Sequence, residues 1–185
     1  MKRLLLAALV LPSAALAHPG HGHDEGQFLH GLMHPVGGAD HLLAMVALGL
    51  LAAQLGGRAV WALPLTFVAA MLGGGLLGAM GVALPAVEPM ILASVVILGV
   101  LVAMAARLPL SALLPMVALF GAAHGWAHGA EGPGSGLALY AAGFALATMA
   151  LHLAGIGFGR LLARGPELRV LGGGTALAGL ALTVA

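Results

Sequence analysis

The sequence has no cysteine and few charged or aromatic residues. Without cysteine it can form neither a disulfide framework nor a zinc-thiolate or iron–sulfur site, so any metal must be held by nitrogen and oxygen. Only 7% of its 185 residues are charged, where a soluble domain carries roughly a quarter. The net charge of +1 and the lack of a basic cluster beyond the first residues exclude a nucleic-acid partner.

What the chain does have is apolar sequence and glycine. Hydrophobic residues make up 61% of it, and its mean hydropathy is +1.09. The 30 glycines are scattered among Leu, Ala and Val with no Gly-X-Y period, which is typical of helices packed closely in lipid. These features predict an all-α integral membrane protein in contact with the lipid bilayer.

The first 27 residues are predicted to be an export signal followed by a polar segment. Lys2 and Arg3 precede an apolar run that ends in small residues at Ala17, which predicts a signal peptide over 1–17 that is cleaved after Ala17. A retained first anchor is the alternative reading. Residues 18–27 then form a histidine-rich periplasmic N-terminus.

Residues 28–185 are predicted to form a bundle of six transmembrane helices. Charged residues separate the apolar stretches, and a span needs about 20 residues. The last stretch has only 16 residues and is the weakest unless its helix begins near Glu167. The predicted spans are 28–55, 59–87, 89–106, 108–130, 132–159 and 170–185.

The basic residues set the expected orientation. Cytoplasmic loops carry Arg and Lys. With the mature N-terminus outside, the loops after spans one, three and five hold all five basic residues of the mature chain, whereas the other two loops hold only Glu88 and Glu131. Both ends of the mature chain are therefore predicted to be periplasmic. The basic residues are Arg58, Arg107, Arg160, Arg164 and Arg169.

The first predicted span carries three histidines and an aspartate. At about 100° per residue, His30, His34 and His41 lie within about 40° of one another on a helix, with Asp40 beside them. Pro35 and the following glycines interrupt the helical pattern, and broken helices within a membrane are tolerated where they line a site.

The fourth predicted span carries a second motif, His124, His128 and Glu131, whose spacing i, i+4, i+7 also places the side chains on one face. Both motifs fall in the outer half of the membrane, so we expect them to face each other across a helix interface. Imidazole with one or two carboxylates suits nickel, cobalt or zinc. Interhelical hydrogen bonding alone is the structural alternative.

Four further histidines are candidates for contact with an ion. His18, His21 and His23 form a metal-attracting tract at the predicted mature N-terminus. His152 lies deeper, in the fifth predicted span, as a hydrogen-bonded core residue or as a relay on the way in.

The two motifs resemble the signatures of a known family. HPVGGADH at 34–41 and HGWAHGAE at 124–131 are similar to the paired motifs of the HupE/UreJ family of nickel and cobalt permeases, and the resemblance covers the whole chain. It implies that His34, Asp40, His41, His124, His128 and Glu131 act in metal transport. One departure is Ala123, where the family often has Phe; Phe120 stands one turn earlier.

These observations predict a permease of the bacterial inner membrane that is not an enzyme. Nickel, or else cobalt or zinc, is its substrate, and it needs no permanent cofactor. The resemblance implies a role upstream of nickel or cobalt enzyme maturation, and a homo-oligomer is left open. Two alternatives are a metal-binding accessory subunit without transport and a membrane enzyme of the di-iron type, because His-x-x-x-His spacing also occurs in such sites.

Overall fold

The computed structural model describes residues 24–162 and 166–184, and all regular structure in these residues is helical. The predicted all-α class is therefore confirmed. The predicted signal peptide and the histidines at 18, 21 and 23 lie outside the described residues. The helices are α1 (Asp24–Gly37), α2 (Ala39–Leu55), α3 (Ala59–Ala79), α4 (Val87–Ala103), α5 (Leu110–Ala130), α6 (Leu137–Leu162) and α7 (Glu167–Leu182).

The first predicted span is broken into α1 and α2, which meet at an angle of 80°. Gly38 lies at the break with an extended backbone (φ −106°, ψ 125°), three residues after Pro35, which has no N–H to continue the helical ladder. The break gives α2 an N-terminus of its own. Asp40 lies in the first turn of α2, where the helix dipole favours a negative charge.

Three of the other predicted spans coincide with helices long and apolar enough to cross a membrane: α3, α5 and α6. The bent pair α1 and α2 makes a fourth candidate if it is counted as one span. α4 and α7 coincide with the two remaining predicted spans but have only 17 and 16 residues. α7 does begin at Glu167. The count of six spans stays a prediction.

Glycines set how closely the helices approach. A methyl group on Gly125 would collide with the carbonyl oxygen of Met71, and one on Gly129 with that of Gly75. α5 thus lies directly on α3, backbone against backbone, which only glycine at these positions permits. The close helix packing predicted from the glycines is therefore confirmed at these positions.

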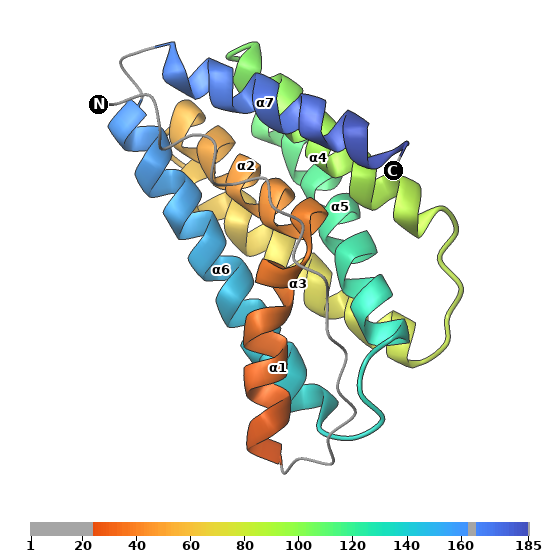
Figure 1. Ribbon diagram of the computed structural model, residues 1–185. Helices are drawn as coiled ribbons and strands as arrows, with labels where there is room; N and C mark the ends of the chain where they lie inside the picture. Colours follow the sequence, from red (N-terminus) through yellow and green to blue (C-terminus); the bar gives the residue numbers. More distant parts are fainter. Residues whose placement is uncertain (1–23, 163–165, 185) are drawn as a thin grey trace.

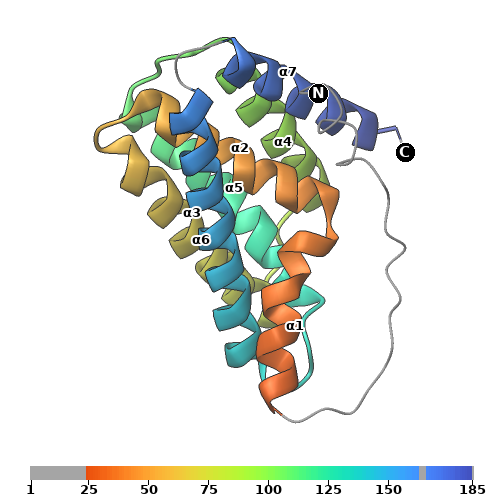
Figure 2. The ribbon, with the colours of Figure 1, turned by 60° about the vertical axis from the view of Figure 1, so that its left-hand side comes forward.

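The remaining helices pair in the same way. Gly49 on α2 fits against Gly155 on α6, and Gly99 on α4 fits against Gly172 on α7. Figures 1 and 2 both show α4 beside α7 along one edge of the molecule, while α1 extends beside α6 toward the opposite end. The core between these pairs includes Met45, Leu48 and Phe67, which are completely buried.

The packing partners also fix the relative directions of the helices. Gly121 and Gly125 meet the backbones of Phe67 and Met71 in that order, so α5 runs parallel to α3. On α6, His152 lies against Phe67 and Thr148 against Met71, so α6 runs antiparallel to α3.

Candidate functional site

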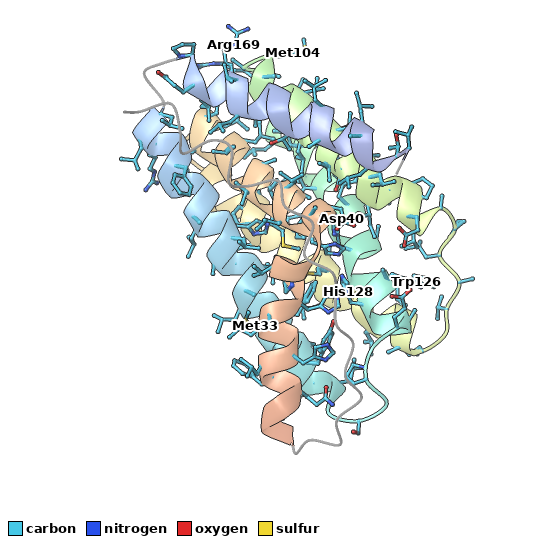
Figure 3. All side chains as sticks on the ribbon, in the orientation of Figure 1. Met33, Asp40, Met104, Trp126, His128 and Arg169 are labelled. Atoms are coloured by element: carbon cyan, nitrogen blue, oxygen red, sulfur yellow. The ribbon has the colours of Figure 1, made fainter. Side chains whose placement is uncertain are left out.

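Four histidines from α1, α2 and α5 gather where α1 meets α2. The rings form a continuous series in the order His34, His128, His41 and His124, and each successive pair has its ring centroids 4.5 Å apart. We call these four residues the histidine cluster. Figure 3 shows Asp40 and His128 near the middle of the molecule, whereas Met104 and Arg169 lie at one end. The two sequence motifs therefore do meet across a helix interface.

Asp40 determines which ring nitrogen of His41 carries the proton and which keeps its lone pair. One oxygen of its carboxylate accepts hydrogen bonds from the backbone N–H of His41, at 2.8 Å, and from the His41 ring at Nδ1, at 2.9 Å. Because an ionised carboxylate can only accept, Nδ1 carries the proton and Nε2 of the neutral ring keeps a lone pair. That Nε2 points at Nε2 of His128, 2.5 Å away. This carboxylate–histidine arrangement is the one that orients metal-binding imidazoles.

Ser94 on α4 does the same for His124 without a charge. Its hydroxyl donates its single proton to the carbonyl oxygen of Ile91, at 2.6 Å, so it must accept in its 3.0 Å hydrogen bond with Nε2 of His124. The proton of His124 is therefore on Nε2, and its Nδ1 carries the lone pair. That Nδ1 is buried and has no hydrogen-bond partner among the described residues.

Aromatic side chains border the cluster, whose His34 end is exposed. The Phe144 ring lies 4.5 Å from His128, and the Phe67 ring lies 5.4 Å from His124. Toward the other end of the cluster, His30 and Tyr140 pack with ring centroids 5.3 Å apart, and both lie 5.8 Å from His34. Such low-dielectric walls strengthen electrostatic interactions inside the cluster.

The histidine rings of the cluster contact one another directly. In residues 24–162 and 166–184, no set of three or more His, Asp or Glu side chains is already spread around one point as metal coordination requires. Two imidazole nitrogens that share an ion at about 2.1 Å each lie about 3.4 Å apart in tetrahedral geometry. The 2.5 Å contact of His41 with His128 would therefore have to open by less than 1 Å to admit an ion.

The other predicted ligands lie apart from the cluster. His30 is exposed and reaches it only through His34. Glu131 follows the last residue of α5 with φ −100° and ψ 4°, and its side chain is exposed. Its backbone N–H still donates to the carbonyl oxygen of Ala127, as in a helix, and its side chain makes no hydrogen bond to the cluster among the described residues, so its role as a ligand stays a prediction. His152 is completely buried on α6, separated from His124 by Phe67.

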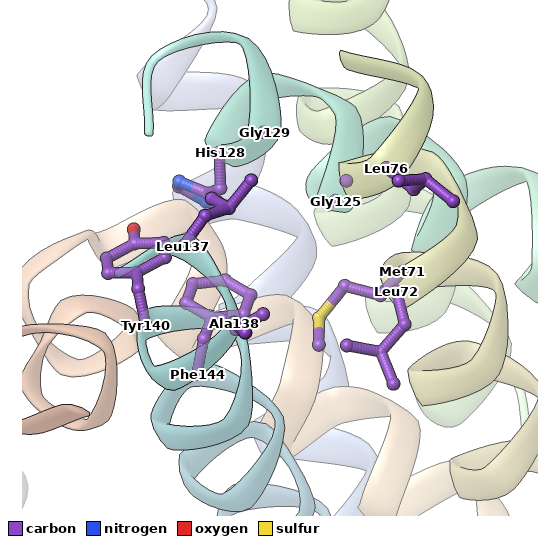
Figure 4. A pocket seen from close by; sticks show the side chains of 12 residues that line it. Met71, Leu72, Leu76, Gly125, His128, Gly129, Leu137, Ala138, Tyr140 and Phe144 are labelled. Atoms are coloured by element: carbon purple, nitrogen blue, oxygen red, sulfur yellow. The ribbon is translucent and has the colours of Figure 1, made fainter. Parts of the chain in front are cut away.

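One pocket adjoins the cluster. It has a volume of about 260 Å³ and lies between α3, α5 and α6. Figure 4 shows His128, Tyr140 and Phe144 on one side of it and Met71 on the other. Part of its wall is formed by Gly125 and Gly129, which have no side chains. The pocket therefore contacts both the histidine cluster and the buried Met71.

Several residues of the site were not identified from the sequence. Ser94 carried a readable signal, since it is the one hydroxyl residue in α4 and polar groups within apolar spans are commonly functional. Phe67, Tyr140 and Phe144 carried none. Aromatic residues in apolar helices are usually core residues, and only the helix packing shows that these three border the cluster.

Comparison with known proteins gives a consistent result. The family model described as HupE / UreJ protein matches residues 6–182. Among curated proteins, "Protein HupE" of Rhizobium leguminosarum bv. viciae is 49% identical over 183 residues, which cover 97% of this chain and 95% of the relative. No solved structure matches the chain.

Proposed function

The chain belongs to the HupE/UreJ family, and from this membership and the histidine cluster we propose that it transports a divalent transition-metal ion, nickel or cobalt, into the cytoplasm. It is a membrane protein of apolar helices. The family is a transporter and accessory family and not an enzyme family, so the prediction that the chain is not an enzyme is confirmed and the di-iron alternative is not favoured.

One observation carries the proposal. Asp40 and Ser94 each accept a hydrogen bond from the N–H of a histidine ring, which leaves the lone pairs on Nε2 of His41 and on Nδ1 of His124. Two neutral imidazoles prepared in this way, with a third ring in contact and one carboxylate to offset charge, suit nickel or cobalt. Zinc is the third candidate.

The helix directions support a transport path. Parallel α3 and α5, with α6 antiparallel to them, agree with the alternating directions that the predicted six-span topology requires. In that topology the cluster lies in the outer half of the inner membrane. We propose that the ion is captured by His18, His21 and His23 and by the exposed Glu131 and His30, loses water at the cluster, and leaves toward the cytoplasm. Enzymes that require nickel or cobalt would receive it there.

Ion influx into liposomes tests the proposal. The purified protein is reconstituted, and nickel, cobalt and zinc entry is followed with an internal metal-sensitive dye. Saturable influx of nickel or cobalt is expected. His41→Ala and His128→Ala should abolish it, and Phe158→Ala, which removes a ring on the exposed surface of α6, should not.

Tight binding without influx above that of empty liposomes would overturn the transport proposal. It would favour the accessory subunit that binds metal without moving it.

A further inference from the structure

His152 is a buried histidine without a partner. Its side chain is completely buried in α6, and neither ring nitrogen has a hydrogen-bond partner among the described residues. Leaving a buried polar group unpaired is unfavourable, because the group loses its hydrogen bonds to water without replacing them. Native structures keep such groups rarely, and each one calls for an explanation.

Two further side chains that could bind a metal ion, a hydroxyl and a thioether, lie near His152. Thr148, one turn earlier on α6, donates a hydrogen bond to Sδ of Met71 on α3, at 3.6 Å. Phe67, one turn before Met71, packs its ring against that of His152 at 5.2 Å. The facing sides of α3 and α6 thus bring an imidazole, a hydroxyl and a thioether within about one helical turn of each other.

This group lies deeper along the bundle than the histidine cluster. Phe144 contacts His128, and His152 follows Phe144 by two turns of α6, or about 12 Å. His124 lies between these levels, and the ring of Phe67 contacts both His124 and His152. The pocket described above reaches from His128 to Met71.

We propose that His152, Met71 and Thr148 form a second, inner binding site that receives the metal ion from the histidine cluster and passes it toward the cytoplasm. This inference rests on the proposed transport function. All three donors are neutral, and no carboxylate among the described residues hydrogen-bonds to them. The site therefore holds a divalent ion less tightly than the cluster beside Asp40, as inward release requires. Imidazole and thioether donors select a transition metal over magnesium or calcium.

Replacing His152 with two side chains of similar volume tests this. His152→Leu removes the donor, whereas His152→Met supplies a thioether in nearly the same space. In nickel influx with reconstituted full-length protein, His152→Leu is expected to reduce the initial rate about tenfold, and His152→Met should stay within about threefold of the unmodified protein. Nickel affinity of the detergent-purified protein, which reports the cluster, should change by less than about twofold in both variants.

Three results would overturn the inner site. Equal loss of influx in both variants would mean that His152 serves packing alone. Unchanged influx in His152→Leu would place the residue off the path. Loss of nickel affinity in His152→Leu would make His152 part of the cluster.

Two controls complete the experiment. If His152→Leu does not fold, Met71→Leu removes the thioether with little change in volume and should lower influx about threefold, and an unchanged rate would overturn the site. If the unmodified protein shows no influx, the transport function itself fails. Influx that these variants leave unaffected would overturn the inner site alone.

Discussion

Asp40→Asn tests the electrostatics of the cluster with little change in shape. The asparagine oxygen can still accept both hydrogen bonds from His41, so the lone pair on Nε2 of His41 is retained. The substitution removes one negative charge next to His41, the residue that is proposed to bind the ion. The variant therefore isolates the contribution of that charge to ion binding.

The magnitude follows from the geometry. The 2.9 Å hydrogen bond, the width of the imidazole ring and a metal–nitrogen bond together place the carboxylate oxygen about 7 Å from an ion on Nε2 of His41. A unit charge and a divalent ion at that distance attract by about 5 kcal/mol at an effective dielectric constant of about 20. The Asp40 side chain is 28% exposed, so solvent screens part of this. We expect a loss of about 2 to 3 kcal/mol, or roughly 30- to 150-fold in nickel affinity.

The assay is nickel titration of the purified protein by calorimetry, together with the half-saturating nickel concentration for influx. Glu167→Gln is the matched control, because it removes the same charge from an exposed position in the first turn of α7. An Asp40→Asn affinity within about threefold of the unmodified protein would refute the reasoning. A loss of similar size in Glu167→Gln would assign the effect to net charge and not to the cluster.

Three further substitutions test the surroundings of the cluster. A methyl group on Gly38 would lie 2.8 Å from the carboxylate oxygen of Asp40, so Gly38→Ala should weaken nickel binding about threefold to tenfold. Gly37→Ala adds its methyl group to open space and should leave nickel binding unchanged. Ser94→Ala removes the acceptor that orients His124 and should weaken nickel binding about tenfold, and Ser94→Thr should restore the binding. Equal nickel affinities of Ser94→Ala and the unmodified protein would contradict this. Gly125→Ala should reduce the free energy of unfolding by about 1 to 3 kcal/mol and so lower the melting temperature, because its methyl group meets the α3 backbone. Gly173→Ala, on an open face, should leave the melting temperature unchanged or raise it.

Apolar stretches separated by charged residues were enough to predict the helical segments, and helical periodicity was enough to predict most of the cluster. The spacing of His124 and His128 places both rings on one face of α5 wherever that helix packs. Glu131, the C-cap residue of α5, still makes the helical bond to Ala127, and its part in the site stays a prediction. The break at Gly38 was foreseeable from Pro35 and the glycines, but its angle of 80° was not.

The other contacts between helices could not be predicted from the sequence in this way. Ser94 meets His124, and Phe67 meets His152, only because α4, α5, α3 and α6 approach through particular faces. Those faces are selected by where glycines allow backbones to touch, as Gly125 does against Met71. A chain with 30 glycines offers many such faces, and the sequence alone does not rank them.

The distribution of carboxylates along the proposed path would give the proposed transport a direction. Glu131 is exposed at the end of α5 that is predicted to face the periplasm, and Asp40 is partly exposed beside the cluster. Beyond Phe67, His152 has only neutral neighbours among its described contacts. A divalent ion is therefore attracted most strongly at the entrance and at the cluster and least at the inner site. An ion that has lost water at the cluster would thus meet progressively weaker ligands on its way inward, and its release at the inner end would need no rearrangement of charge.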